Sequence, residues 1–223
     1  MAPIEQEYRF ALSRDEFRRL RQALAPPLGS VLQENHYLDT ESWALRLRGY
    51  GLRLRIEDGT PRLLTLKGPA REEGGDRLRG ITRREETESP VPPGTAPEIL
   101  EGRRPLGDLG LDLPAVLMDH ATQRVLVWGR IETRRRTYRP GLPECERLPA
   151  FLFELDEVRF PNGRVDHELE VEWQGTAGRA LDRALHEFLE HLGIPVRPRN
   201  SSKLARLLHS LGGGTGPDPD LNA

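Results

Sequence analysis

Lysine, cysteine and long apolar segments are all scarce in this 223-residue chain. Lysine occurs only at Lys67 and Lys203, so that arginine supplies 31 of the 33 basic residues. A position that keeps lysine against this background is a candidate for a specific role, because the two cations are not equivalent donors. The single cysteine, Cys145, excludes an internal disulfide and favours a reducing compartment. With neither a membrane-length apolar run nor a signal peptide, we expect a cytoplasmic protein that does not enter a membrane.

An excess of one charge sign is also lacking. The net charge is −2 although 30% of the residues are charged. A plain nucleic-acid binder would carry a basic excess, so no nucleic acid is expected as a partner. The length suits one sizeable domain, and neither a repeat nor a linker divides the chain. We therefore expect one domain over residues 1–211 and a flexible tail over residues 212–223, in a monomer or a homodimer.

Residues 4–10 carry charged side chains at every second position. They read IEQEYRF, so that Glu5, Glu7 and Arg9 share one face of a strand and the opposite face is largely apolar. Two carboxylates at such spacing repel each other unless a cation lies between them. Hard oxygen ligands favour a divalent ion such as Mg²⁺. The pattern therefore indicates a metal site, with a solvated strand as the alternative.

The same alternation of charged and aliphatic residues recurs along the chain. It predicts strands over residues 31–39, 52–56, 62–67, 81–89, 125–138, 151–159 and 166–173. Helices are few: a capping box at Ser13 and Glu16 begins one that ends near Leu24, and others are expected at 96–100, 114–118 and 176–192, with a last one after Asn200-Ser201-Ser202. Residues 45–48 alternate as well, and we interpret them as an outer helical or turn segment. Residues 70–80 are expected to form a mobile loop.

With so few helices, the aliphatic faces must pack under them while the charged faces point inward. The economical arrangement is an α+β fold in which antiparallel strands close into a barrel, which also removes exposed strand edges. Its interior would hold the acidic residues Glu5, Glu7, Glu86, Glu88, Asp156, Glu168 and Glu170. It would also hold the cations Arg53, Arg55, Lys67, Arg84, Lys203 and several of Arg134, Arg135 and Arg136. Carboxylates for Mg²⁺ or Mn²⁺ beside so many cations predict a site for a polyphosphate–metal complex.

These segments together resemble the CYTH domain, or triphosphate tunnel metalloenzyme, family. Glu5-Gln6-Glu7-Tyr8-Arg9 is similar to its ExExK signature, with Arg9 in place of the lysine. The other similar segments follow in family order: Tyr37-Leu38-Asp39-Thr40, Leu52–Arg55, Thr65-Leu66-Lys67, Arg84/Glu86/Glu88, Thr133–Arg136, Asp156, Glu168–Glu172 and Ser202-Lys203. The resemblance implies a tunnel of about eight antiparallel strands, a polyphosphate substrate and a divalent metal.

On this basis we expect a metal-dependent hydrolase of inorganic tripolyphosphate or of an organic triphosphate such as thiamine triphosphate. Metal ligation is assigned to Glu5, Glu7, Glu86, Glu88, Asp156, Glu168 and Glu170. Substrate binding is assigned to Arg9, Arg53, Arg55, Lys67, Arg84, Arg134, Arg135, Arg136 and Lys203, and catalysis to Glu5, Glu7, Glu168, Glu170, Lys67 and Lys203. Two alternatives are an adenylyl cyclase of the related type, which releases pyrophosphate from ATP, and a non-catalytic polyphosphate-binding module.

One choice is left open by the sequence. If Arg134 and Arg136 point into the barrel, Arg135 points out, and the reverse arrangement fits the alternation equally well.

Overall fold

The strands close into one barrel. The computed structural model describes residues 4–24, 26–70, 81–140, 151–173 and 178–212. All neighbouring strands are antiparallel, in the order β1-β5-β4-β3-β2-β6-β7-β8, and β8 pairs with β1 to complete the circle. The bounds are β1 (Ile4–Leu12), β2 (Gly29–Thr40), β3 (Gly51–Glu57), β4 (Thr60–Lys67), β5 (Ile81–Pro90), β6 (Val125–Tyr138), β7 (Leu152–Arg159) and β8 (Val165–Glu172). The predicted closed barrel is confirmed.

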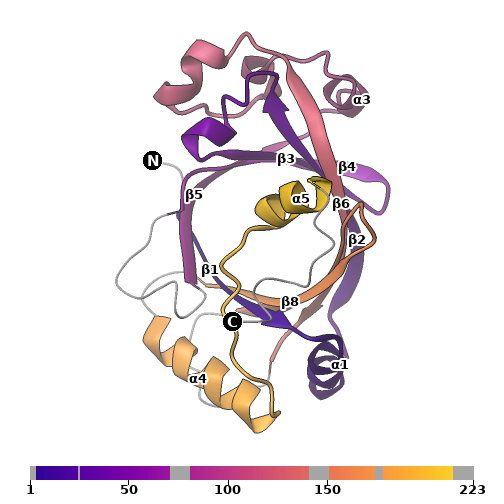
Figure 1. The fold of residues 1–223 in the computed structure, drawn as a ribbon, viewed down its shortest axis with the longest axis vertical. Helices are drawn as coiled ribbons and strands as arrows, with labels where there is room; N and C mark the ends of the chain where they lie inside the picture. The colour runs from indigo at the N-terminus through magenta and orange to yellow at the C-terminus, as the bar shows by residue number, and fades with distance from the viewer. Residues whose placement is uncertain (1–3, 25, 71–80, 141–150, 174–177, 213–223) are drawn as a thin grey trace.

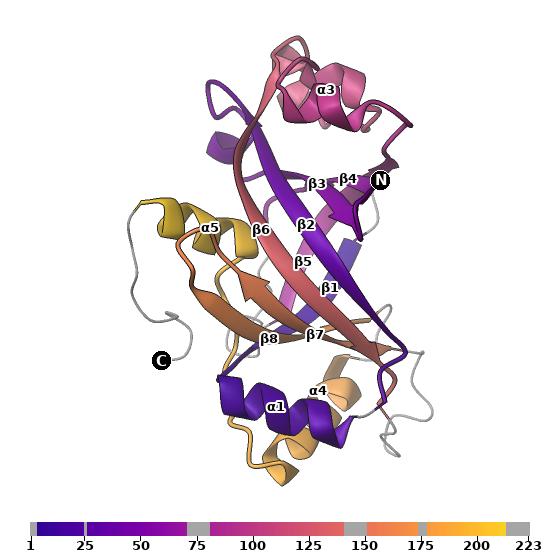
Figure 2. The same ribbon diagram turned by 90° about the vertical axis from the view of Figure 1, so that its right-hand side faces the viewer.

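Two apolar layers cover the outside of the barrel. At one end, α1 (Arg14–Ala23) and α4 (Gly178–His191) pack over β1 and β8, where Tyr8, Phe10 and Leu185 are fully buried. Toward the other end, α3 (Ala96–Leu100) and the short 3-10 helices η2 (Leu106–Leu109) and η3 (Ala115–His120) cover the outer face of β3 and β4. Figure 2 shows these two sets of helices at opposite ends of the molecule.

The last helix, α5 (Lys203–Leu211), lies across the opening of the barrel, as Figure 1 shows. It begins at the N-cap Ser202, whose Oγ accepts a hydrogen bond from the amide of Ala205 at 3.1 Å. Leu207 of this helix packs with Ile131 of β6 and with Val158 of β7. The first turn of α5 therefore points toward the barrel interior.

Local expectations from the sequence hold in most places. The capping box of α1 is present, because Glu16 accepts a hydrogen bond from the Ser13 amide at 2.7 Å and Ser13 Oγ accepts one from the Glu16 amide at 3.4 Å. Residues 46–48 form the 3-10 helix η1 (Arg46–Arg48), as expected for an outer turn. β2 is longer than expected, because its pairing with β6 extends to Gly29. The expected loop over 70–80, the tail and Cys145 lie almost entirely outside the described residues.

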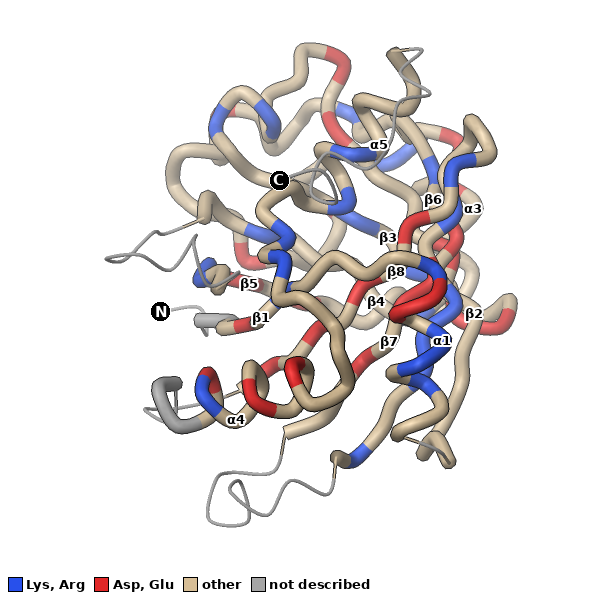
Figure 3. The backbone as a smooth tube through the Cα atoms, turned by 60° about the horizontal axis from the view of Figure 1, so that its bottom comes forward, with Lys and Arg blue, Asp and Glu red and all other residues tan. Residues whose placement is uncertain are grey.

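Charged residues of both signs follow the strands around the barrel (Figure 3). Their aliphatic neighbours point to the two outer layers, as the alternation predicted. Among the described residues, no helix is both long and apolar enough to cross a membrane.

Candidate functional site

The barrel encloses a cavity of about 1130 Å³. Every strand contributes lining side chains, because every second residue of a strand points to the same face. Most of these side chains are polar or charged. The predicted site residues among them are Glu7, Arg9, Arg53, Arg55, Lys67, Arg84, Glu86, Glu88, Arg135, Glu170 and Lys203.

Carboxylates gather on β7 and β8, and we call Glu154, Asp156, Glu168 and Glu170 the acidic wall. These two strands pair in a register that sets Asp156 opposite Glu168 and Glu154 opposite Glu170. One oxygen from each of Asp156, Glu168 and Glu170 lies within 4.8 Å of the other two, and all three residues are buried. Like charges directly opposite on a sheet destabilise it unless cations compensate them.

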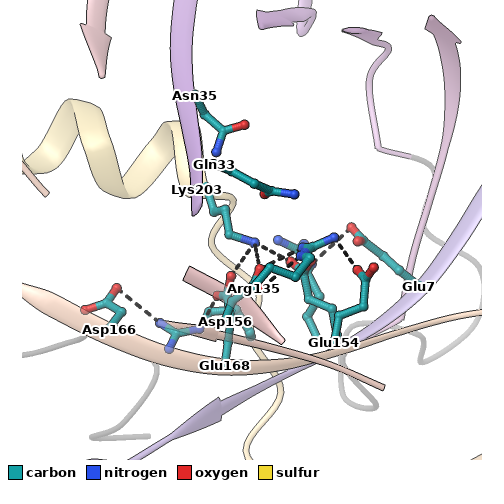
Figure 4. Close-up of polar contacts among 12 residues, drawn as sticks. Glu7, Gln33, Asn35, Arg135, Glu154, Asp156, Asp166, Glu168 and Lys203 are labelled. Carbon is teal, nitrogen blue, oxygen red and sulfur yellow. Dashed lines mark hydrogen bonds and ion pairs between the residues drawn. The ribbon is translucent and has the colours of Figure 1, made fainter. Parts of the chain in front are cut away.

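Two cations reach this wall from inside the barrel. The guanidinium of Arg135 on β6 donates to both oxygens of Asp156, at 2.8 and 2.7 Å, and also contacts Glu154 and Glu170. The ammonium of Lys203 at the start of α5 lies 2.9 Å from Asp156, 2.5 Å from Glu168 and 2.6 Å from Glu170. Figure 4 shows both side chains converging on the carboxylates. Arg135 therefore points inward, which decides the choice that the sequence left open.

Two further arginines hold the acidic wall from behind. Arg206 of α5 is 1% exposed, and it donates to Asp166 and to Glu168 at 2.6 Å each. Arg199 is fully buried, with its guanidinium 3.4 Å from Glu168 and 3.7 Å from Asp166. Buried charges need such partners because their desolvation is costly. The position of Glu168 is therefore set by cations on two sides.

The pKa values reflect this compensation. Burial would lower the pKa of Arg135, but Asp156, Glu154 and Glu170 raise it well above its ordinary value. Burial would raise the pKa of Glu170, but Lys203 and Arg135 hold it well below the usual range. Glu154 differs, because burial outweighs Arg135 and raises its pKa. Asp156, Glu168 and Glu170 are the three carboxylates of the acidic wall that Lys203 contacts.

A second group of cations, Arg53 and Arg55 of β3 and Arg84 of β5, forms what we call the basic wall. Arg84 lies nearest the acidic wall, because β5 is two positions from β8. In the closed strand order, β3 is four positions from β8, on the opposite side of the barrel. Arg53 donates to Thr65 at 3.3 Å, and Arg55 donates to Asn35 at 3.3 Å. The buried Nε of Arg53 and that of Arg84 have no hydrogen-bond acceptor among the described residues. Burial, followed by the neighbouring Arg53 and Arg135, lowers the pKa of Arg55 to about 10.

Several predicted residues lie on β4 and β5, among the strands of the basic wall, or on β1 between the two walls. Lys67 and Glu86 form an ion pair of 2.9 Å, and Glu88 accepts a hydrogen bond from Thr65 at 3.2 Å. Arg9 is 4% exposed and lies 3.2 Å from Glu7, and it also donates to Thr82 at 2.8 Å. The structure therefore places Glu86 beside Lys67 and Glu88 beside the hydroxyl of Thr65, both on β4, and not in the acidic wall.

Five predicted residues are not among the described residues that line the cavity. Asp156 and Glu168 are fully buried, in contact with Lys203 at the edge of the cavity. Arg134 is exposed, and Arg136 is half-buried and does not line the cavity, because both neighbour the inward-pointing Arg135. Glu5 pairs with Arg84 in the β1–β5 register, and its side chain lies outside the described part of the chain.

Sequence reasoning missed four charged residues of this site: Glu154, Asp166, Arg199 and Arg206. The first two had a signal, since each precedes a predicted ligand by two residues on its strand (Asp156 and Glu168). Arg199 and Arg206 had no such signal in the sequence, because arginine is abundant throughout the chain. Only the packing of the segment around α5 brings them to Asp166 of β8.

The acidic wall suits a hard divalent cation. Buried, convergent carboxylate oxygens from Asp156, Glu168 and Glu170 are the ligand type that Mg²⁺ and Mn²⁺ prefer. Because Lys203 already contacts all three residues, a metal ion at this position competes with its ammonium.

Comparisons with known proteins agree with this architecture. The family model of the CYTH domain matches residues 3–207. A Bacillus subtilis protein named "Putative triphosphatase YjbK" is 30% identical over 198 residues, covering 87% of this chain and 89% of the relative.

Solved structures show the same fold. One, of a Hippeastrum protein, carries the description "Putative adenylyl cyclase HpAC1 from Hippeastrum reveals a dominant triphophatase activity". It has a TM-score of 0.75 and 24% identity, and the match covers 92% of this chain and 96% of that one. A Bacillus halodurans protein described as a "putative adenylate cyclase" has a TM-score of 0.64 and 22% identity, with 90% and 95% covered.

Proposed function

We propose that this chain, which belongs to the CYTH domain family, is a divalent-metal-dependent hydrolase of a triphosphate. The observation that carries the proposal is the pair of opposed walls in one cavity. The basic wall supplies buried N–H groups that have no acceptor in the described part of the chain, and the acidic wall supplies a cluster of carboxylates. A triphosphate chain with a bound cation is complementary to both at once.

The chain's own cations bind and orient the substrate. Arg53, Arg55 and Arg84 face the nonbridging oxygens, for which the planar guanidinium offers paired donors. Lys67 and Lys203 add compact charges from the two sides of the cavity. Because these groups are fixed before the substrate arrives, they stabilise charge that develops in the transition state without further reorganisation. Positioning and charge stabilisation account for most of the acceleration in phosphoryl transfer.

The metal would be held at the acidic wall by Asp156, Glu168 and Glu170, with Glu7 and Glu5 on the neighbouring β1. When bound, Mg²⁺ or Mn²⁺ supplies charge neutralisation of the phosphate oxygens and activation of the attacking water. Arg206 and Arg199 keep Glu168 ionised and oriented from behind. Arg135 orients Asp156 and keeps Glu170 ionised and oriented.

The test is phosphate release from tripolyphosphate, thiamine triphosphate and ATP, with Mg²⁺, with Mn²⁺ and with a chelator. We expect release that requires the metal. The double variant Glu5→Gln, Glu7→Gln is expected to lose turnover while its circular dichroism spectrum stays that of the wild type. Cyclic AMP from ATP would instead identify the cyclase. Tight polyphosphate binding with neither release nor cyclic AMP would identify a binding module and refute the proposal.

A further inference from the structure

A second hollow adjoins the triphosphate cavity. It is a groove of about 750 Å³ between η1, β6 and α5, lined by Trp43, Arg46, Trp128 and Leu208 among others. Gly49, Tyr50, Ser202 and Leu204 line both the groove and the cavity. Ser202 directly precedes Lys203, which contacts the acidic wall. A ligand whose triphosphate lies in the cavity can therefore extend into the groove without leaving the protein surface.

The groove presents an aromatic platform. The rings of Trp43 and Trp128 stack with their centroids 3.9 Å apart and their planes at 29°. The guanidinium carbon of Arg46 lies 5.2 Å from the centroid of the Trp43 ring. Because Trp128 and Arg46 both lie over the Trp43 ring, the surfaces left for a planar ring are the outer face of Trp128 and that of the exposed Arg46 guanidinium. Bases stack on aromatic rings and on arginine.

Backbone strain marks the same place. Trp43 has a φ of 58°, a conformation that is uncommon for a bulky residue. The strained turn is held by the buried carboxylate of Asp39, which accepts hydrogen bonds from the amides of Leu45 at 3.0 Å and of Arg46 at 2.9 Å. A residue kept in an unfavourable conformation by a dedicated buried group is a pointer to function rather than to packing alone.

The charges of the groove select among aromatic groups. Arg46 donates hydrogen bonds and repels other cations, so it favours a neutral ring that carries acceptors. A purine base has ring nitrogens of this kind, whereas a cationic ring such as that of thiamine is disfavoured beside Arg46.

We propose that the groove of Trp43, Trp128 and Arg46 binds the base of a purine nucleoside triphosphate whose phosphates occupy the barrel cavity. This inference rests on the proposed function and names its substrate class. The platform adds affinity for the organic group, whereas inorganic tripolyphosphate uses the cavity alone.

The experiment compares kcat/KM for GTP, ATP, thiamine triphosphate and tripolyphosphate in the wild type and in Trp43→Ala, Arg46→Gln and Leu47→Ala. Leu47 is the matched control, because it follows Arg46 in η1 but is 76% exposed and outside the groove. Trp43→Ala removes the ring that supports both Trp128 and Arg46, so it is expected to lower kcat/KM for the purine nucleotides roughly tenfold, the order of one base–aromatic stack, and to leave tripolyphosphate within about twofold. Arg46→Gln is expected to reduce GTP and ATP turnover but not that of thiamine triphosphate.

Binding provides a readout apart from turnover. The affinities of the protein for the β,γ-imido analogue of GTP and for imidotriphosphate are measured by calorimetry. In Trp43→Ala, only the affinity for the nucleotide analogue is expected to fall. If that variant does not fold, Arg46→Gln, which keeps both indoles, carries the test.

Equal losses of kcat/KM for the purine nucleotides and for tripolyphosphate in Trp43→Ala and Arg46→Gln would overturn the inference. A wild-type preference for thiamine triphosphate over the purine nucleotides would overturn it too. Turnover of tripolyphosphate without turnover or binding of purine nucleotides would overturn it while leaving the proposed function intact. Absence of metal-dependent release from every substrate would refute the proposed function itself.

Discussion

The two walls of the barrel hold their arginines in opposite environments. On the acidic wall, Arg135 contacts three carboxylates, whereas on the basic wall Arg53 and Arg84 each keep a buried Nε without an acceptor among the described residues. The pKa of Arg135 is accordingly raised, and that of Arg55 is lowered to about 10 because burial is not offset by an equal negative charge. On the acidic wall the cations and carboxylates contact each other closely, whereas the described residues offer no acceptor to the Nε of Arg53 or of Arg84.

The difference shows that buried arginines in one barrel can serve separate purposes. Cations on the acidic wall stabilise a carboxylate cluster that would otherwise repel itself. Under the proposed function, the cations of the basic wall serve affinity for the substrate, at a cost in stability that is common at functional sites. Substitutions on the two walls should therefore affect different properties.

The largest effect is expected from Arg206→Met. It leaves the buried carboxylates of Asp166 and Glu168 with one cation fewer, and loss of one partner from a buried ion pair costs about 3–5 kcal/mol. Arg55→Met removes a desolvated cation and should change the free energy of unfolding by less than about 1 kcal/mol. Urea unfolding of both variants measures this difference. Equal losses in the free energy of unfolding would contradict the prediction.

Next comes the effect of Arg55→Gln on turnover. A hydrogen bond between charged groups contributes about 1.5–3 kcal/mol, so kcat/KM for tripolyphosphate should fall about 10- to 100-fold. Arg130→Gln is the control, because Arg130 of β6 has a side chain that is 51% exposed and pairs with Glu34 outside the cavity. A phosphate-release assay in which both variants behave alike would remove the distinction between the basic wall and ordinary surface cations.

The smallest effect concerns an ion pair outside the barrel. Arg197 lies 2.7 Å from Glu16, and chiefly through this hydrogen bond the pKa of Glu16 is lowered to about 2. A lowered folded-state pKa adds stability above the ordinary value near 4.5, and this stability disappears as the pH falls through about 2. Glu16→Gln should therefore cost about 1 kcal/mol at pH 7 and almost nothing near pH 2, measured by urea unfolding at both pH values. A loss independent of pH would contradict this reading.

The barrel could be predicted because charge and aliphatic residues alternate so regularly from Glu5 to Glu172. The inward direction of Arg135 could not, because three consecutive arginines satisfy either phase and only the pairing with Asp156 selects one. The stacking of Trp43 on Trp128 could not be predicted either, since 85 positions separate them and their contact depends on the pairing of β2 with β6. Contacts made by the segment leading into α5, such as those of Arg199, likewise leave no periodic signal.

The most direct test of the two-wall account compares Glu170→Gln with Arg55→Gln in one assay. The initial rate of phosphate release from tripolyphosphate is measured over a grid of Mn²⁺ and substrate concentrations. Glu170→Gln should raise the apparent Mn²⁺ constant by at least about tenfold with a smaller change in KM. Arg55→Gln should raise KM and leave the Mn²⁺ constant nearly unchanged. If both variants shift the same parameter by similar factors, the walls do not have separate roles and the account is wrong.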